Sequence, residues 1–566
     1  MTAALGVVVG YLLVWQRGFY LDDYFEAFLA RDAVTGLWQP DFNPLHYRYF
    51  PVRTLRMVVV SNLQGLVPQQ ELLVREICAS VISANAGLLG WFIYRMVRSR
   101  LAAVVTCWSF VLPFWAHEAV LWLAAIQYAF GAAFSLLFLH CCWSVVSGSR
   151  RPLLWIALGA VSLLVSVLLI EVFVAAPALI PFLALIAAVR RGHPNVTVAR
   201  FGRLALALAV PACVLLAAYV LIYRSSPVVA ARGNLHSFGD GIPSIPARGL
   251  ARLDELKRMT IDPDWGSRIA LDAARVGMET LVSSTLGTAL GVAIVLALAM
   301  TVITWRRDRT ALRIEVGTVL ALAALGIAWI TMGSLIPYVP LQLDLRHSRL
   351  LYFPLAGFAV TCGAIAWLLS ATIGGHGQRV ALTLSGLLLL GSAVTMLGHA
   401  SAYQARHQRD VEQIRAVLEA VPKELLPSRA VIALRGMDER LFGQQDAISG
   451  SVDGVLENEV FSDVVLQQAY GHPNVLAITA TRWSSIRFRT ELAQLLFERG
   501  ASDKRLHDLS RHMVVIQFRD GQALPVESLS VIDPDGTRLE LDLAIGQQVR
   551  MRGLPTLKRL ELDLRH

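Results

Sequence analysis

The chain has 566 residues, of which 55% are hydrophobic and only 16% are charged. This composition is too apolar for a soluble globular protein of that size and predicts a multi-spanning membrane protein. The formal charge of +9 does not indicate a nucleic-acid partner, because a basic excess in a polytopic protein usually marks its cytoplasmic loops.

Apolar runs close to the ~20 residues that span a bilayer predict about eleven transmembrane helices. The runs lie at about 3–20, 72–95, 101–121, 123–146, 152–170, 172–189, 203–223, 282–304, 314–335, 350–371 and 379–398. The first run lacks a basic n-region and a clear A-x-A cleavage site. It therefore predicts a retained helix rather than a signal peptide.

Arginines follow every second predicted helix, which places those loops in the cytoplasm by the positive-inside rule. They are Arg95, Arg98, Arg100, Arg150, Arg151, Arg190, Arg191, Arg200, Arg203, Arg306, Arg307, Arg309 and Arg313. The other loops, at 20–71, near His117, at Glu171, at 224–281 and at 336–349, are then expected outside. The C-terminal part, which follows an odd number of helices, is also expected on the outer side of the cytoplasmic membrane.

The C-terminal part has a different pattern and predicts a soluble α/β domain. "RDVEQIRAVLEAV" has a helical apolar period, and "AVIALRG" and "NVLAITA" are typical of buried strands. The segment 513–543 alternates around the turns Asp520-Gly521 and Pro534-Asp535-Gly536. We therefore expect a transmembrane domain over residues 1–399 and an extracytoplasmic, periplasmic α/β domain over residues 400–566.

The sequence contains neither a cysteine pattern nor a histidine motif typical of zinc binding. All six cysteines lie in apolar runs and form no CxxC pair, which indicates neither a disulfide framework nor a zinc site. "HEAVL" at 117–121 begins like the HExxH motif of zinc proteases, but its fifth residue is Leu121. No metal ligand set is predicted, and the need for a divalent cation is left open.

Polar residues gather in the loops expected outside. "FYLDDYFEAF" holds Asp22 and Asp23, the first loop holds "HYRYFPVRTLR" with Arg48, and "PFWAHEAVLW" holds His117 and Glu118. Ionisable groups at the membrane are costly and tend to face a cavity or a partner. The two aspartates could also be ordinary interfacial carboxylates, and His117 an ordinary hydrogen-bonded interfacial residue.

Two further positions belong to the same side. Glu171 begins the sixth predicted helix, where it serves either as a site residue or as a carboxylate at the positive end of the helix dipole. "LDLRHSRLLYFP" supplies Arg346, His347, Arg349 and Tyr352 before the tenth helix.

In this order, "LDDY", "HYRYFPVR", "HEAVLWLAAIQYAFGAAF" and "RHSRLLYFPLAGFA" resemble the motifs of the polytopic GT-C glycosyltransferases. Within them, the chain is most similar to the O-mannosyltransferases that carry TPR repeats and to their bacterial relatives. The resemblance covers most of residues 10–371 as short motifs in order. Two departures are Tyr49-Phe50, which intervene between Arg48 and Pro51, and Gln127, where the family often has a basic residue. The C-terminal domain does not resemble TPR repeats.

The resemblance implies an inverting transfer of a sugar from an undecaprenyl- or dolichyl-phosphate carrier to a glycan, lipid or protein acceptor at the outer membrane face. It implies Asp22 or Asp23 as the catalytic carboxylate and gives Glu118 a catalytic place in the motif. Arg48, Arg346, Arg349 and Tyr352 are expected at the donor phosphate, and His117, His347 and Glu171 are further candidates. The alternative is a non-enzymatic polytopic protein, either a transporter of lipid-linked sugars or an assembly component of the cell envelope.

Overall fold

The structure, a computed structural model, describes two groups of residues. The first comprises 70–111, 116–121, 125, 127–191, 214, 266–283, 316–335 and 348–426. The second comprises 430–435, 454, 456, 459–471, 475–478, 484–489, 494–499, 503–508, 513–519, 522–532, 538–543, 550–552 and 559–563. The predicted helix 3–20 lies outside these residues, as do nearly all of those predicted at 203–223 and 282–304.

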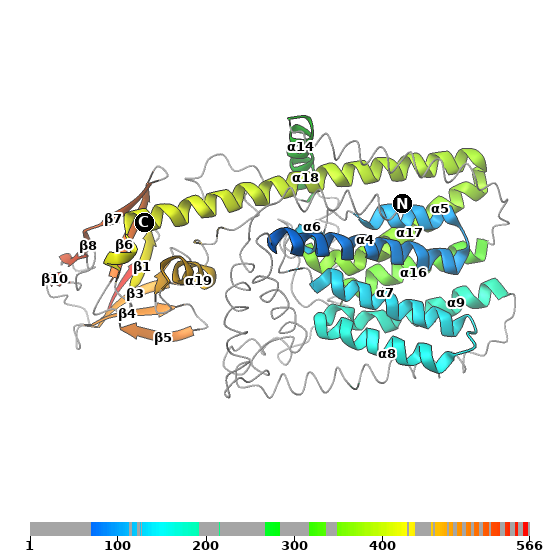
Figure 1. The fold of residues 1–566 in the computed structure, drawn as a ribbon, viewed down its shortest axis with the longest axis horizontal. Coiled ribbons are helices and arrows are strands. Elements are labelled where there is room, and N and C mark those ends of the chain that lie inside the picture. Colours follow the sequence, from blue (N-terminus) through cyan, green and yellow to red (C-terminus); the bar gives the residue numbers. More distant parts are fainter. Residues whose placement is uncertain are drawn as a thin grey trace. The chain divides into compact units, whose positions relative to one another are not determined.

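Seven helices among the described residues are long and apolar enough to span a membrane, which gives the described chain the elements of a multi-pass membrane protein (Figure 1). They are α4 (Gln70–Val97), α7 (Gln127–Val146), α8 (Pro152–Leu169), the 3₁₀ helix η4 (Glu171–Leu179) continued by α9 (Ile180–Arg191), α16 (Val316–Leu335), η5 (Ser348–Leu351) continued by α17 (Tyr352–Ile373), and α18 (Gly375–Ala420). Each overlaps a run that the sequence predicts to cross the membrane.

Two predicted helices differ from the structure. The run 101–121 is not one helix, because α5 (Arg100–Val111) ends early and the short helix α6 (His117–Leu121) follows it. Pro113 lies in the sequence between them, and proline cannot continue a helix without losing a hydrogen bond. The run 379–398 is part of a much longer helix, since the 46 residues of α18 also include "RDVEQIRAVLEA", which the sequence assigns to a separate helix.

Helix α17 packs closely against its neighbours α16 and α5. A Cβ atom at Gly357 would lie 2.6 Å from the carbonyl oxygen of Gly326 and 2.8 Å from Cβ of Trp329, both in α16. Small residues let membrane helices approach in this way, because packing rather than water exclusion holds them together. One further described helix, α14 (Gly266–Ser283), contacts α18 where Gly277 lies against Val394.

We expect the Gly357→Ala substitution to destabilise the protein by about 1–3 kcal/mol, the usual cost of overpacking a core. Gly391→Ala is a matched control, because a Cβ atom at this α18 glycine would have no other atom within 4 Å. The measurement is thermal unfolding of each purified variant in detergent. Equal midpoints for the two variants would show that the α16–α17 contact can relax at no cost.

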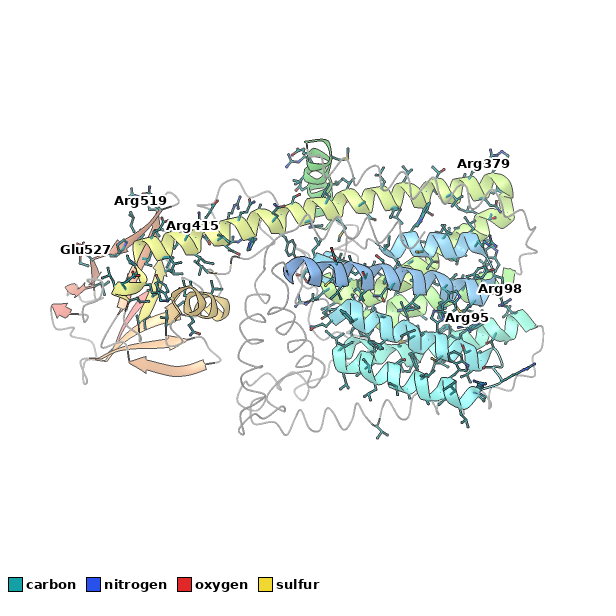
Figure 2. The ribbon with its side chains drawn as sticks, in the orientation of Figure 1. Arg95, Arg98, Arg379, Arg415, Arg519 and Glu527 are labelled. Carbon is teal, nitrogen blue, oxygen red and sulfur yellow. The ribbon has the colours of Figure 1, made fainter. Side chains whose placement is uncertain are left out.

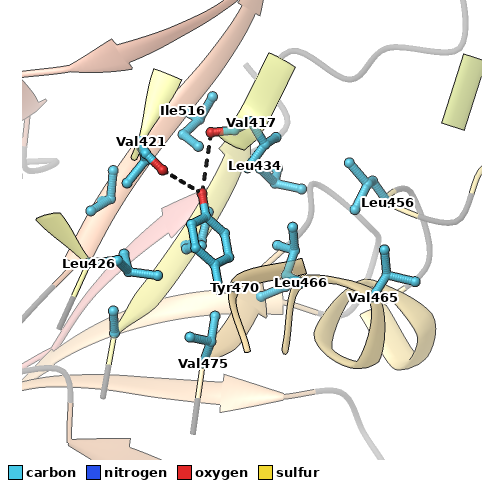
Figure 3. Packing of buried hydrophobic residues seen from close by; sticks show 14 of the residues in the cluster. Val417, Val421, Leu426, Leu434, Leu456, Val465, Leu466, Tyr470, Val475 and Ile516 are labelled. Atoms are coloured by element: carbon cyan, nitrogen blue, oxygen red, sulfur yellow. Dashed lines mark hydrogen bonds between the residues drawn. The ribbon is translucent and has the colours of Figure 1, made fainter. Parts of the chain in front are cut away.

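Contacts divide the chain into two units, and among the described residues the first ends at Ser401 and the second begins at Ala402. The second unit holds the end of α18, η6 (Lys423–Leu425), α19 (Glu459–Tyr470) and all the strands that the structure describes. Its core includes Val417 from α18, Val421 directly after that helix, Leu466 and Tyr470 from α19, and Ile516 from the sheet (Figure 3). The periplasmic location of this unit stays a prediction.

The hydroxyl of Tyr470 lies 3.2 Å from the carbonyl oxygen of Val417 and 3.0 Å from that of Val421 (Figure 3). Burial raises the pKa of this phenol, so Tyr470 keeps its proton and donates it to these carbonyls. Val417 lies in the last turn of α18 and Val421 directly follows the helix, where carbonyl groups run out of helical partners; the Val417 carbonyl also accepts the Val421 N–H at 3.0 Å. Tyr470 thereby fixes the end of α18 in the core of the second unit.

The strands form three sheets. The first has the order β2-β1-β6-β7, in which β1 (Val431–Arg435) is parallel to β2 (Leu476–Ile478) and β6 (Met513–Arg519), while β7 (Gln522–Val526) is antiparallel to β6. The second has the antiparallel order β11-β3-β4-β5, and the third the antiparallel order β10-β9-β8. Their strands are β3 (Ser484–Arg489), β4 (Gln494–Arg499), β5 (Asp503–Asp508), β8 (Ser528–Ile532), β9 (Arg538–Asp542), β10 (Arg550–Arg552) and β11 (Arg559–Asp563).

The sequence predicts several of these strands correctly. The two predicted buried strands correspond to β1 and β2. The positions predicted as turns, 520–521 and 534–536, fall in the sequence between β6 and β7 and between β8 and β9, which pair antiparallel. A mixed α/β unit is therefore confirmed for the described part of the C-terminal region.

Candidate functional site

Two of the polar motifs meet in the structure. Nη1 of Arg349 in η5 lies 2.8 Å from Oε2 of Glu118 in α6. The backbone N–H of Arg349 donates to the same oxygen at 3.4 Å. The contact joins residues 231 positions apart, and both belong to motifs on which the family resemblance rests.

The Glu118–Arg349 pair lies in a partly dry environment. The Glu118 side chain is 9% exposed and that of Arg349 is 22% exposed. Charge-assisted hydrogen bonds of this length are strong, and a carboxylate removed from water needs such a partner to stay ionised. The pair can therefore hold a guanidinium in a fixed orientation while part of that guanidinium remains open to the surface.

Breaks in the helices place the pair at one end of the bundle. Helix α6 follows the end of α5, contacts α4 and α7, and lies beside the N-terminal part of α4 (Figure 1). Element η5 forms the tight first turn in front of α17 and packs against α6. Glu118 and Arg349 therefore both lie on short elements, α6 and η5, that pack against each other.

Tyr352 begins α17, three residues after Arg349, and is fully buried. Nδ2 of Asn85 in α4 donates to the Tyr352 hydroxyl at 3.3 Å and to the carbonyl oxygen of Ala129 in α7 at 2.7 Å. The Tyr352 ring also packs 5.2 Å from that of Phe110 in α5. Tyr352 thus ties the start of α17 directly to α4 and α5, and through Asn85 to α7. Its contact with a donor phosphate stays a prediction.

Asn85 is the residue that sequence reasoning missed. It is fully buried in the middle of α4, within the apolar segment "SVISANAGLLG". A side-chain amide inside a membrane-spanning segment is expensive unless it serves a contact, and this signal could have found it. Its Oδ1 atom has no hydrogen-bond partner in the described part of the chain.

Most of the other predicted site residues cannot be placed relative to this pair from the described residues. Asp22, Asp23, Arg48, Arg346 and His347 lie outside the described residues. His117 is the first residue of α6, next to Glu118. Glu171 opens the 3₁₀ helix η4 rather than an α-helix, directly after an extended Ile170, and Pro177 within η4 interrupts regular helical hydrogen bonding there.

No group of three or more His, Cys, Asp or Glu side chains is placed to hold a metal ion in the regions that the structure describes. The Glu118–Arg349 pair offers one carboxylate, already bonded to a cation, and so does not fit a metal site by itself. The need for a divalent cation therefore stays open.

Comparison with known proteins gives no match to a protein-family model and no match among curated proteins. Solved structures of similar shape include the oligosaccharyltransferase of Archaeoglobus fulgidus in complex with zinc and sulfate. That match has 11% identity, a TM-score of 0.36, and covers 87% of this chain and 68% of the other.

Two other solved structures show a similar degree of likeness. The oligosaccharyltransferase AglB of Archaeoglobus fulgidus, with an inhibitory peptide and a dolichol-phosphate, has 12% identity and a TM-score of 0.37 over 89% of this chain and 75% of that one. ArnT of Cupriavidus metallidurans, bound to undecaprenyl phosphate, has 15% identity and a TM-score of 0.33 over 80% of this chain and 86% of that one. At TM-scores this low, the function of this chain has to be inferred from its own residues.

Proposed function

We propose that the chain is an inverting membrane glycosyltransferase of the GT-C type, which takes a sugar from a polyprenyl-phosphate carrier at the outer face of the cytoplasmic membrane. The observation that carries the proposal is the Glu118–Arg349 pair, at 2.8 Å. It joins two of the sequence motifs that resemble this class, and a guanidinium held at the end of a bundle of apolar helices suits a lipid-linked phosphate.

The reaction needs one base and one cationic site. The acceptor hydroxyl oxygen forms a bond to the anomeric carbon of the sugar. At the same time the bond between that carbon and the phosphate oxygen breaks, and the electron pair of the broken bond leaves with the lipid phosphate. The hydroxyl proton goes to a carboxylate, for which Asp22 is our candidate. Arg349 stabilises the negative charge on the departing phosphate.

Glu118 is best suited to orient Arg349 in this scheme. Its Oε2 accepts both the guanidinium and the backbone N–H of Arg349, so the carboxylate is already charge-compensated. Arginine has five N–H donors, and a guanidinium fixed by a carboxylate on one side can present other donors to a phosphate. Proton transfer then falls to the aspartates at 22 and 23.

We expect Arg349→Ala to weaken the binding of undecaprenyl phosphate by more than ~1.5 kcal/mol, about tenfold in Kd, because a hydrogen bond to a charged group is lost. Arg349→Lys should restore only part of the affinity, since the planar fork is missing. Native mass spectrometry of the purified protein with added undecaprenyl phosphate measures this. Arg379→Ala, which removes an exposed arginine of α18, is the matched control. Equal binding by wild type and Arg349→Ala would remove this residue from the donor site.

The proposal also requires the second unit to lie outside. Alkaline phosphatase fused after His566 should be active, because this reporter needs the oxidising periplasm to form its disulfides. A fluorescent protein fused at the same place should stay dark in the periplasm. A fusion pair with the opposite behaviour would reverse the orientation and the outer-face site with it.

A turnover assay separates the enzyme from the transporter alternative. The purified protein is incubated with a panel of synthetic undecaprenyl-phosphate sugars and acceptors, and free undecaprenyl phosphate is detected by mass spectrometry. An enzyme releases the free carrier, whereas a transporter moves the intact lipid-linked sugar between the leaflets of a vesicle.

A further inference from the structure

A second cluster of polar side chains lies at the other end of the helices, away from α6. Arg95 belongs to the last turn of α4, and Figure 2 shows it at the same end as Arg98. Its Nη1 lies 3.2 Å from Nδ1 of His140, and its Nη2 donates to Oγ of Ser144 at 2.9 Å. Both partners belong to α7.

The hydrogen bonds fix the protonation of this cluster. A guanidinium can only donate, so Nδ1 of His140 must accept, and the imidazole proton lies on Nε2. That nitrogen donates to the carbonyl oxygen of Leu88 at 3.0 Å. Oγ of Ser144 donates to the carbonyl oxygen of His140 at 2.9 Å. His140 is therefore neutral, and both partners of the Arg95 guanidinium are uncharged.

The guanidinium is also held in place by packing. Its Cζ atom lies 5.3 Å from the centre of the Trp91 ring, and the Trp91 and His140 rings are 4.6 Å apart. His140 and Ser144 are almost completely buried. Arg95 thus presents its charge in one orientation instead of moving freely in solvent.

A second arginine reaches the same place from α9. Nη1 of Arg190 lies 3.5 Å from the carbonyl oxygen of Arg95 and makes a short contact with that of Met96. These are terminal carbonyls of α4, where a cation is favoured by the helix dipole. Two cations from two helices therefore meet at the end of α4.

No carboxylate of the described helices around Arg95 balances the charge of its guanidinium. The sequence contains no Asp or Glu from 77 to 117 or from 119 to 170, and none in α5, α7, α8, α9, α16 or α17. Trp91, which packs on Arg95, is 54% exposed, and tryptophan at the end of a membrane helix favours the head-group region. The cluster thus combines an oriented cation, Arg95, that no carboxylate of these described helices compensates with an exposed aromatic side chain.

We propose that Arg95, with Arg190, His140, Ser144 and Trp91 around it, binds the phosphodiester of an anionic phospholipid in the leaflet next to this end of the helices. Basic sites between membrane helices recognise anionic head groups in this way. The site is distinct from the donor site proposed at Arg349, and it does not depend on glycosyl transfer.

The test is native mass spectrometry of the full chain in detergent, titrated with dioleoyl phosphatidylglycerol or dioleoyl phosphatidylcholine. Wild type should hold one phosphatidylglycerol more tightly than phosphatidylcholine. Arg95→Gln should weaken that binding by about tenfold or more, as expected for a lost charge-assisted contact. Arg379→Gln, an exposed arginine at the same end (Figure 2), should change it by less than about twofold.

Equal losses in Arg95→Gln and Arg379→Gln would overturn the proposal, because the arginines would then act only through their summed charge. Equal retention of the two lipids by wild type would overturn it as well. Millimolar inorganic phosphate should not displace the lipid, and displacement would reassign the cluster to free phosphate.

If Arg95→Gln does not fold, Arg95→Lys, which keeps the charge but loses the planar fork of the guanidinium, should show an intermediate loss of phosphatidylglycerol. Arg349→Ala should leave phosphatidylglycerol binding unchanged, which separates this test from that of the donor site.

Discussion

Substitution of Asp22 by Asn should lower sugar transfer by 10²-fold or more, within the ~10²–10⁴-fold range of general-base catalysis. Asparagine keeps the shape of the side chain but cannot take the proton of the acceptor hydroxyl. The assay is the release of undecaprenyl phosphate by the purified variant, with donor binding measured in parallel. Donor affinity and thermal stability should stay close to those of wild type.

Asp23→Asn is the matched control for this experiment. Adjacent residues on a helix point about 100° apart, so the two aspartates should not be interchangeable, and Asp23→Asn should have the smaller effect. Transfer at the wild-type rate by Asp22→Asn would exclude it as the base. If Asp23→Asn and Glu118→Gln were equally active, the non-enzymatic alternative would become the better description.

Breaking the Glu118–Arg349 pair should cost about 3 kcal/mol of unfolding free energy, the low end of the ~3–5 kcal/mol seen when one partner of a buried ion pair is removed. The low end applies because the Arg349 side chain is 22% exposed. Glu118→Leu leaves a cation without its carboxylate, and Arg349→Leu leaves a carboxylate without its cation. Thermal or denaturant unfolding in detergent measures both.

The double variant Glu118→Leu/Arg349→Leu should lose less stability than the sum of the two single variants, because no unpaired charge remains. Strict additivity would show that the two side chains do not interact in the folded protein. Arg275→Leu is a suitable control, since its partner Glu279 lies at 3.8 Å and both side chains are largely exposed. Surface pairs of that kind contribute little, so this control should be nearly silent.

The membrane-spanning helices are largely predictable because each needs a run of apolar residues about as long as the bilayer is thick. Runs such as 152–170 and 314–335 agree with α8 and α16 within a few residues. Hydropathy does not show where a helix stops inside an apolar stretch, so it joined α5 to α6. It also does not show that a helix continues beyond the bilayer, so α18 was predicted as two elements.

The strands were predictable only where their own residues carry a pattern. "MVVIQFR" in β6 is apolar through most of its length, and the turn-forming sequence Asp520-Gly521 stands between it and β7. In contrast, β5 reads "DKRLHD" and has a single apolar side chain. Its conformation comes from pairing with β4, which no local pattern encodes.

At the site, the family motifs pointed to Glu118 and Arg349, which do meet. The sequence could not show that one oxygen of Glu118 binds both the side chain and the backbone of Arg349, because the two lie 231 residues apart. Asn85 was overlooked because a single polar residue does not change the hydropathy of α4.

The mixed sheet of the second unit has the order β2-β1-β6-β7, and both of its outermost strands offer few backbone donors to a further strand. Strand β2 has only three residues, and β7 contains Pro525, which has no backbone N–H to offer. A sheet grows by adding a strand only where an edge presents a run of unpaired donors and acceptors. Both ends of this sheet are therefore poor templates for extension, which opposes self-association through edge-to-edge pairing of this sheet. At this sheet, any polypeptide partner would have to be recognised through side chains rather than as an added strand.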